Sequence, residues 1–244
     1  MQVLLAGASG ALGGPLVRHL TAAGHQVSGI TRSTQGASRI MQSGGSPIVV
    51  DVMDRDALLR AVDGQTFHAV IHELTALKKA PARHRDLAQT NALRTTGTAH
   101  LLEAAQATGA RRFVTQSIVL GYGYVDHGTT LLTEDSPFGV PQGNAFDPHL
   151  AAMVATEQLA TSTQGIEGMA LRYGLFYGAD RQCRCHAAQT DAARRPRRGR
   201  DSLHPPRGCR RRHGGRAAPR PSGKGLQHRR RHARYVPAAC HRHR

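Results

Sequence analysis

The chain begins with an apolar run that ends in a glycine-rich turn, and this feature limits its fold more than any other. Residues 2–7 read QVLLAG, which is typical of a short buried strand, and residues 13–24 have helical apolar spacing and stop at Gly24. Gly7, Gly10 and Gly13 lie between the two elements. A strand, a glycine turn and a helix in this order predict the first unit of a parallel sheet that binds a dinucleotide.

Strands and helices continue to alternate along the chain. Further strands are predicted at 25–31, 46–52, 68–74, 111–119 and 167–178, and helices at 55–64, 87–109 and 147–163. In the long helix Leu93, Leu101, Leu102 and Ala105 are expected to face inward. Because such alternation produces parallel strands covered on both faces, the fold class is α/β, with a doubly wound Rossmann sheet in residues 1–180.

The glycine turn predicts where the phosphates of the cofactor bind. The first glycine permits a tight turn, the second lets the backbone approach a pyrophosphate, and the third lets the helix pack on the strand. Unpaired N–H groups at the helix N-terminus then attract the phosphates. The contacts predicted in this turn are Gly7, Ser9, Gly10, Ala11, Leu12 and Gly13. The alternative is an ordinary glycine-rich turn.

The end of the second strand bears on the choice of cofactor. An acidic residue there would bind the ribose 2′-hydroxyl of NAD, whereas an arginine can receive the 2′-phosphate of NADP. This chain has Thr31 followed by Arg32. The pair favours NADP, with NAD still possible, and the alternative is that Arg32 is simply a solvated surface residue.

Composition divides the chain near residue 180. Residues 181–244 hold 20 Lys and Arg against 2 Asp and Glu, together with all four cysteines, whereas the first 180 residues are almost neutral. Leu203, Leu226 and Val236 are the only larger aliphatic residues of this basic tail, so we expect it to be disordered. Such a tail can bind nucleic acid non-specifically, but its cysteine spacing fits no zinc site and it lacks interleaved aromatic residues. No metal site is predicted anywhere.

No signal or membrane segment is predicted, because the apolar run at the N-terminus is short and no basic region precedes it. A cytoplasmic enzyme without a membrane partner is therefore the expectation. The oligomeric state is not predicted.

Six motifs of the body resemble the extended short-chain dehydrogenase/reductase superfamily, within it the NAD-dependent epimerase/dehydratase family. They are the glycine turn, VVDVMD at 49–54, VIHELTA at 70–76, TNALRTTGTAHLLEAA at 90–105, RRFVTQSIVLGYG at 111–123 and LRYGLFYG at 171–178. The resemblance implies a redox or epimerase activity on a small metabolite or nucleotide-sugar. The cofactor contacts that it implies are Asp51, Val52, Leu74, Thr75, Ala76, Asn91, Gln116 and Ser117.

The catalytic pair of that family is missing. The family uses a Tyr four residues before a Lys, and alignment on Glu157 places His149 and Met153 at these positions. The remaining candidates for catalysis are Ser117, His149 and Tyr122, with Tyr124 and Tyr173 as further tyrosines. The alternatives are that His149 is a surface or helix-start histidine and that Tyr173 is a core residue. His72 and Glu73 are either polar contacts at a strand end or a capped strand end. The alternative function is a cofactor-binding sensor or scaffold that performs no turnover.

The basic tail also lacks the motifs of the family's substrate-binding lobe. When its codons are read one base later, the degenerate code permits YNIVDD from residue 226 and FIHLEDA from residue 203, and both resemble motifs of that lobe. We therefore predict that the reading frame is lost between Asp180 and Gln182, and that residues 181–244 are an out-of-frame remnant of this lobe.

Overall fold

The computed structural model describes residues 1–77, 81–129, 131–174, 176 and 240–241. Within this part of the chain the strands form one sheet in the order β3-β2-β1-β4-β5-β6-β7. The first six strands are parallel: β1 Gln2–Ala6, β2 Gln26–Thr31, β3 Ser46–Val49, β4 Ala69–His72, β5 Arg112–Ile118 and β6 Glu167–Tyr173. β7, Cys240–His241, pairs antiparallel with β6.

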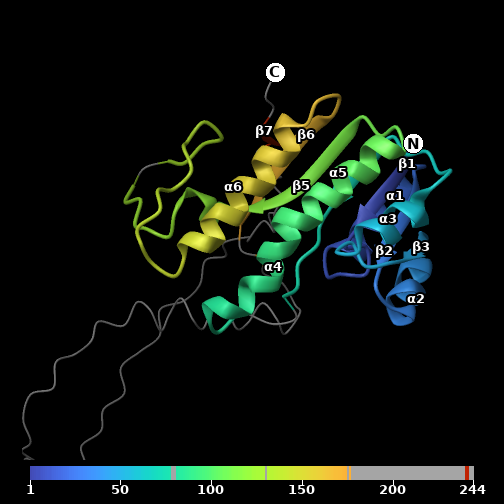
Figure 1. The fold of residues 1–244 in the computed structure, drawn as a ribbon, viewed down its shortest axis with the longest axis horizontal. Helices are drawn as coiled ribbons and strands as arrows, with labels where there is room; N and C mark the ends of the chain where they lie inside the picture. Colours follow the sequence, from blue (N-terminus) through green and yellow to red (C-terminus); the bar gives the residue numbers. More distant parts are fainter. Residues whose placement is uncertain (78–80, 130, 175, 177–239, 242–244) are drawn as a thin grey trace, which may run out of the picture.

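Helices cover both faces of the sheet (Figure 1). The α-helices are α1 Gly13–Ala22, α2 Thr34–Gln42, α3 Arg55–Val62, α4 Ala88–Ala92, α5 Thr98–Ala107 and α6 Asp147–Ser162. Short 3-10 turns, η1 His84–Leu87 and η3 Val119–Tyr122, and a π-helical turn, η2 Leu93–Gly97, complete the list. The structure confirms the predicted α/β, doubly wound Rossmann fold.

Two clusters of buried apolar residues lie between the sheet and its two layers of helices. On one face Leu4, Val70 and Phe113 pack with residues of α3, α5 and α6, among them Leu101. On the other face Leu5 and Val27 pack with Val17 of α1 and Ile40 of α2. Neighbouring residues of β1 thus enter opposite clusters, as the alternation of side chains along a strand requires.

Two predictions about helices need correction. The sequence reading left residues 32–45 without a helix, yet α2 lies there, begun by Ser33, whose hydroxyl accepts a hydrogen bond from Gly36 N at 3.1 Å. Gly36 made the helix hard to see, and it is needed because a Cβ at this position would overlap Thr31 Oγ1. The predicted helix 87–109 is also divided, since the π-helical turn η2 separates α4 from α5.

The inward residues of that helix were predicted correctly. Leu93, Leu101, Leu102 and Ala105 are all buried. The predicted strand 46–52 is shorter, ending at Val49. Of the predicted tail the structure describes only β7, so the expected disorder, and the lost reading frame, fall outside the described residues.

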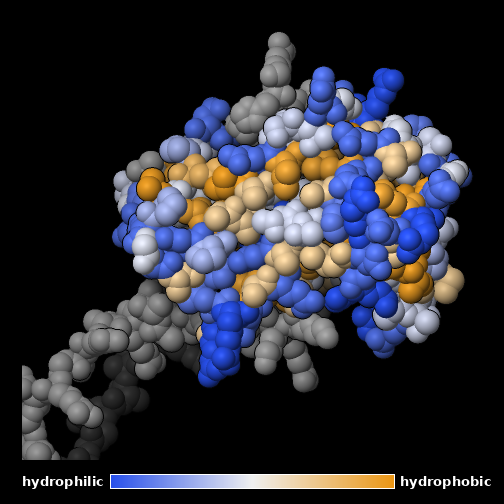
Figure 2. Space-filling view, in the orientation of Figure 1, coloured by the Kyte–Doolittle hydropathy of each residue, from blue (hydrophilic) through white to orange (hydrophobic). Residues whose placement is uncertain are grey.

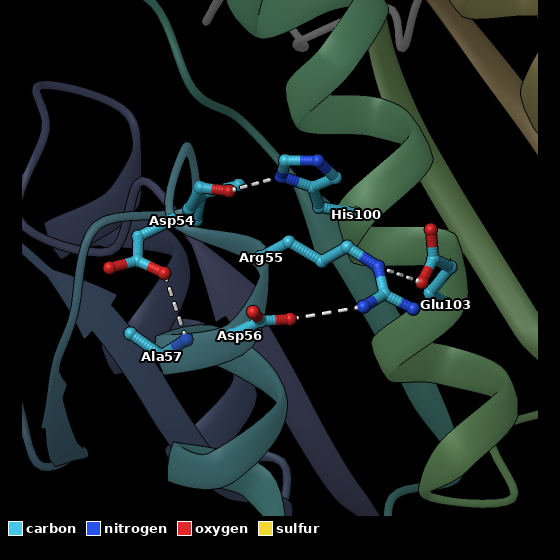
Figure 3. Close-up of polar contacts among 7 residues, drawn as sticks. Asp54, Arg55, Asp56, Ala57, His100 and Glu103 are labelled. Atoms are coloured by element: carbon cyan, nitrogen blue, oxygen red, sulfur yellow. Dashed lines mark hydrogen bonds and ion pairs between the residues drawn. The ribbon is translucent and has the colours of Figure 1, made fainter.

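Polar contacts join the start of α3 to α5 (Figure 3). Asp54 begins α3 by accepting a hydrogen bond from Ala57 N at 3.0 Å, and Arg55 Nε contacts Glu103 Oε2 at 2.6 Å. His100 Nδ1 donates to the carbonyl of Val52 at 2.8 Å. Because water screens the exposed Arg55–Glu103 pair, it contributes little to the free energy of folding. Figure 2 shows apolar and polar side chains interleaved on the face that carries α5 and α6.

Candidate functional site

The glycine turn joins β1 to α1 at the carboxyl edge of the sheet. Gly7 has a φ of 93°, and a Cβ there would lie 2.7 Å from the carbonyl oxygen of Glu73, so another residue does not fit. A Cβ at Gly13 would overlap the Gly7 carbonyl, which confirms that this glycine lets the helix approach the strand. Gly10 and Ala11 are exposed at the outside of the turn.

The start of α1 has the features of an anion site. Leu12 precedes the helix with no side-chain cap, and the first turn contains no acidic residue. The N–H groups and the positive end of the helix dipole are therefore not neutralised by the helix's own side chains. Together with the exposed, side-chain-free backbone at Gly10, the turn fits the pyrophosphate of a dinucleotide.

The end of β2 lies beside this turn. Thr31 is buried, and its hydroxyl lies 3.4 Å from Ser9 Oγ. Arg32 is exposed and its NH1 lies 3.8 Å from Asp51 Oδ2. Asp51 follows β3 and accepts a hydrogen bond from Met53 N, while Val52 is buried. The residues predicted for the adenosine half of the cofactor are thus brought together.

The segment after β4 lies along the same edge. Leu74 accepts a hydrogen bond from Gln116 Nε2 at 3.4 Å, Thr75 is exposed, and the N–H of Ala76 donates to Thr90 Oγ1 at 3.2 Å. The fully buried His72 accepts from Leu74 N through Nδ1, and its Nε2 lies 3.3 Å from the Leu93 carbonyl. His72 therefore caps the strand end, and burial lowers its pKa to about 4.

Glu73 and Tyr173 meet across β5. The Tyr173 hydroxyl donates to Glu73 Oε1 at 2.8 Å. Burial raises the pKa of Glu73 to about 7, although the hydrogen bond from Tyr173 acts in the opposite direction. Ser117 lies on β5, the strand between them, and its Oγ has no hydrogen-bond partner among the described residues. A carboxyl group that titrates near neutral pH can exchange protons with a ligand at this edge.

The first turn of α6 holds His149, the residue at the position of the family's tyrosine. It is only 4% exposed, so it is not a surface histidine. Its Nδ1 lies 2.8 Å from Asn91 Nδ2 and its Nε2 lies 3.0 Å from His84 Nδ1. Burial lowers the pKa of His149, and the charges of His84 and Arg94 lower it further. Met153 follows one turn later and is buried, so α6 offers no cation there.

A cavity of about 940 Å³ opens beside this turn. Its walls are largely apolar or aromatic, from Leu120, Tyr124, Phe138 and Phe146, and His84 and His149 both line it. Tyr122 also lines the cavity, and its hydroxyl donates to the Thr133 carbonyl at 3.0 Å.

A buried ion pair packs against Tyr122 and Phe138, two residues that line the cavity. Arg172 binds both carboxylate oxygens of Glu157, and the two side chains are 12% and 8% exposed. The guanidinium carbon lies 4.7 Å from the centre of the Tyr122 ring and 4.3 Å from that of Phe138. Tyr122 is therefore held in place by a cation on its face.

Sequence reasoning missed two basic residues of this region. His84 lies in RHRD, a polar segment without any periodic pattern, and only the structure brings it to His149. Arg94 lies in the π-helical turn, 5% exposed, and its Nε has no hydrogen-bond partner within the described residues. Burial lowers the pKa of Arg94 to about 10. No sequence signal marked this turn, because Leu93 to Gly97 lie inside the uninterrupted helix predicted over 87–109.

Two features are absent from the described residues. No helix among them has the length and apolar character that crossing a bilayer requires. No group of three or more His, Cys, Asp or Glu among them has the geometry of a metal site.

Comparison with known proteins places the chain in a family. The model of the NAD dependent epimerase/dehydratase family matches residues 3–198. A 3-diazoavenalumate denitrifying reductase of a Streptomyces species is 44% identical over 183 residues, which cover 73% of this chain and 57% of that protein. The chain thus spans little more than half the length of this curated relative.

Two solved structures share the fold at similar coverage. The Bordetella bronchiseptica enzyme WbmG in complex with NAD is 26% identical, with a TM-score of 0.55 over 70% of this chain and 52% of that chain. The UDP-glucose 4-epimerase of Thermus thermophilus in complex with NAD is also 26% identical, with a TM-score of 0.60 over 75% and 57%. With its Rossmann sheet and glycine turn, this chain belongs to the NAD-dependent epimerase/dehydratase family.

Proposed function

We propose that the protein is an NADP-dependent reductase that transfers hydride to a diazo-bearing organic acid. The observation that carries this proposal is the cavity at the start of α6, where His149 and Met153 replace the tyrosine and lysine of the family. The oxidation of a sugar hydroxyl needs a base that can take an alcohol proton, which the Tyr–Lys pair supplies. Reduction of a diazo carbon has no such requirement.

The proposed reduction balances in atoms and electrons. A neutral compound with its diazo group on a non-aromatic carbon gains one hydride and one proton at that carbon. The carbon–nitrogen bond breaks, and its electron pair leaves with dinitrogen. The bound nicotinamide would supply the hydride. The chain's own residues would hold the cofactor at the glycine turn, orient the substrate in the cavity and provide the proton.

Sequence similarity supports this substrate class over a nucleotide-sugar. The relative at 44% identity is named as a reductase of a diazo acid, whereas the epimerase structure is 26% identical. The cavity is lined by flat apolar side chains and by Arg83, His84, His127 and His149. Asp147 also lines it, but its carboxylate is engaged by the N–H groups of Gln142, Gly143 and Asn144. A basic, apolar cavity favours an aromatic or unsaturated carboxylate.

The cofactor proposed is NADP, because Thr31 replaces the acidic residue that would bind the ribose of NAD, and Arg32 is exposed beside it. Arg32→Ala should weaken NADPH binding tenfold or more while leaving NADH binding unchanged, since one phosphate contact of a guanidinium is worth about 1.5–3 kcal/mol. Titration of each cofactor against protein fluorescence or by calorimetry measures both. Arg39→Ala, an exposed arginine of α2, is the matched control. Equal loss of NADH and NADPH affinity would contradict the preference.

Turnover is tested by mixing the protein and NADPH with ethyl diazoacetate, the α-diazo acid phenyldiazoacetate, a set of ketones and UDP-glucose. We expect NADPH oxidation with release of one dinitrogen per NADPH from the diazo acid. Stoichiometric NADPH binding without oxidation by any compound would instead indicate a cofactor-binding protein without turnover. Epimerisation of UDP-glucose would show that the substrate class is wrong.

A further inference from the structure

Three side chains form a hydrogen-bonded row that ends at the cavity. Asn91 Nδ2 lies 2.8 Å from His149 Nδ1, and His149 Nε2 lies 3.0 Å from His84 Nδ1. The planes of the two imidazoles differ by only 8°, with ring centres 5.2 Å apart. That separation equals one hydrogen bond plus the two ring radii, so the bond between the rings lies in their common plane.

The row uses both nitrogens of His149. A neutral imidazole has one nitrogen that donates and one that accepts. Because the NH2 of Asn91 donates to Nδ1, His149 carries its hydrogen on Nε2 and donates it to His84 Nδ1. His149 therefore has no nitrogen left for a ligand.

His84 is placed differently. Its Nδ1 accepts from His149, so in the neutral state its hydrogen is on Nε2, which no described residue contacts. The residue is exposed and lines the cavity. Its Nε2–H is thus the end of the row that a ligand and water can both reach.

The surrounding charges limit the pair to one extra proton. His149 is faced by His84 on η1 and by Arg94 on η2, and both act on it as positive charges. On α6 itself the carboxylate of Asp147 is occupied by three backbone N–H groups. Two imidazolium rings whose facing nitrogens lie 3.0 Å apart would repel strongly, so the first positive charge disfavours the second protonation.

We propose that His84 is the catalytic acid of this cavity, and that His149 and Asn91 are positioning residues that aim its Nε2–H at the ligand. The inference rests on the proposed reduction. The imidazolium of His84 gives its Nε2 proton to the carbon that receives hydride, the carbon–nitrogen bond breaks, and His84 becomes neutral.

Reprotonation follows from the exposure of His84, which takes a proton back from water. When His84 is protonated, its Nδ1–H donates to His149 Nε2. His149 then carries its own hydrogen on Nδ1, and the side-chain amide of Asn91 rotates so that its oxygen accepts that hydrogen. Asn91 Oδ1 is buried without a hydrogen-bond partner among the described residues, and the rotation of the amide would give it a partner.

The first test is an NMR titration of the imidazoles in the complete chain, which requires no turnover. We expect His84→Gln to raise the pKa of His149, because the neighbouring positive charge is removed. His19→Gln, an exposed imidazole of α1, should leave His149 unchanged. An unchanged titration of His149 in His84→Gln would overturn the inference whether or not the protein reduces any diazo compound.

The second test measures NADPH oxidation by phenyldiazoacetate across pH. In the unaltered protein the rate should fall as pH rises, because the proposed acid must be protonated to donate. His84→Ala should lower the rate about 100-fold, as expected for loss of a general acid, and abolish this pH dependence. His149→Gln should lower the rate about tenfold, which corresponds to about 1.4 kcal/mol, and retain it.

Chemical rescue separates the two histidines. Added imidazole should restore part of the activity of His84→Ala, because the site is open to solvent, but not that of a His149→Ala protein. The reverse pattern would identify His149 as the acid and overturn the assignment. If no variant reduces any diazo compound, the proposed function fails, and the titration of His149 alone decides this inference.

Discussion

The two halves of the sheet differ in how completely they are covered. In the β1–β3 half, both faces of β1 and β2 lie under helices, and Leu5, Val27 and Ile30 are at most 4% exposed, whereas the edge strand β3 is exposed or partly buried. In the β4–β6 half, α5 and α6 cover one face, but on the opposite face Val114, Met169 and Leu171 are only partly buried. Val114 is in register with Ile71 and Met169, so these side chains share that face.

This difference distinguishes the half of the sheet that carries the glycine turn from the half beside the cavity of His149. Parallel strands are normally buried on both faces. The residues after β6 would be expected to supply the missing layer, yet residues 181–244 have few apolar side chains to bury. The partly buried face of β4–β6 therefore agrees with the proposal that this segment is read out of frame.

The largest effect is expected from correcting the frame. Resequencing the codons for Tyr177 to Cys185 comes first, followed by expression of the gene with one base removed near Asp180–Gln182. If the corrected segment covers ~200 Å² of apolar surface on the sheet, the free energy of unfolding should rise by about 5 kcal/mol. Urea denaturation of both proteins measures this.

A chain truncated after residue 180 is the matched control, because it separates loss of the basic tail from gain of a new layer. If the source DNA confirms the present frame, and the corrected protein is no more stable than the truncated one, the frame proposal is wrong.

A pair of core substitutions compares the halves directly. Leu5→Ala removes a fully buried side chain between two layers and should cost about 2–5 kcal/mol. Met169→Ala removes a partly exposed side chain and should cost about 1 kcal/mol. Equal costs by urea denaturation would show that the β4–β6 half is as well covered as the other. In the frame-corrected protein the cost of Met169→Ala should rise toward that of Leu5→Ala.

A further comparison concerns pH, at the boundary between the halves. His72 is buried in its neutral form, with a pKa of about 4 in place of 6.5. Below pH 6.5 the unfolded chain binds a proton that the folded chain does not, so stability is complete above this value and decreases as pH falls toward 4. The loss from this group should be on the order of 3 kcal/mol.

Urea denaturation at several pH values, with His72→Asn and the exposed His19→Gln as the matched pair, measures this loss. The His72 variant should lose much of the pH dependence between 6.5 and 4, and the His19 variant should keep it. Identical profiles for all three proteins would contradict the assignment.

Much of the cofactor half could be predicted because its signals are local. The apolar run, the glycine turn and the helix that follows are contiguous, and the third glycine has the packing role expected of it. The substrate half was harder, since its contacts join distant segments. His84 and His149 are 65 residues apart, and Glu73 and Tyr173 are 100 apart. No spacing rule connects such pairs.

The sequence by itself determined the α/β alternation, the family, the glycine turn and the place where composition changes, because each depends on neighbouring residues or on a short repeat. The tertiary structure alone decided that His149 has no free nitrogen, that His84 reaches the cavity, and that Arg94 is buried without a hydrogen bond to its Nε among the described residues. These properties depend on which strands and helices pack together, so they exist only once the sheet has formed.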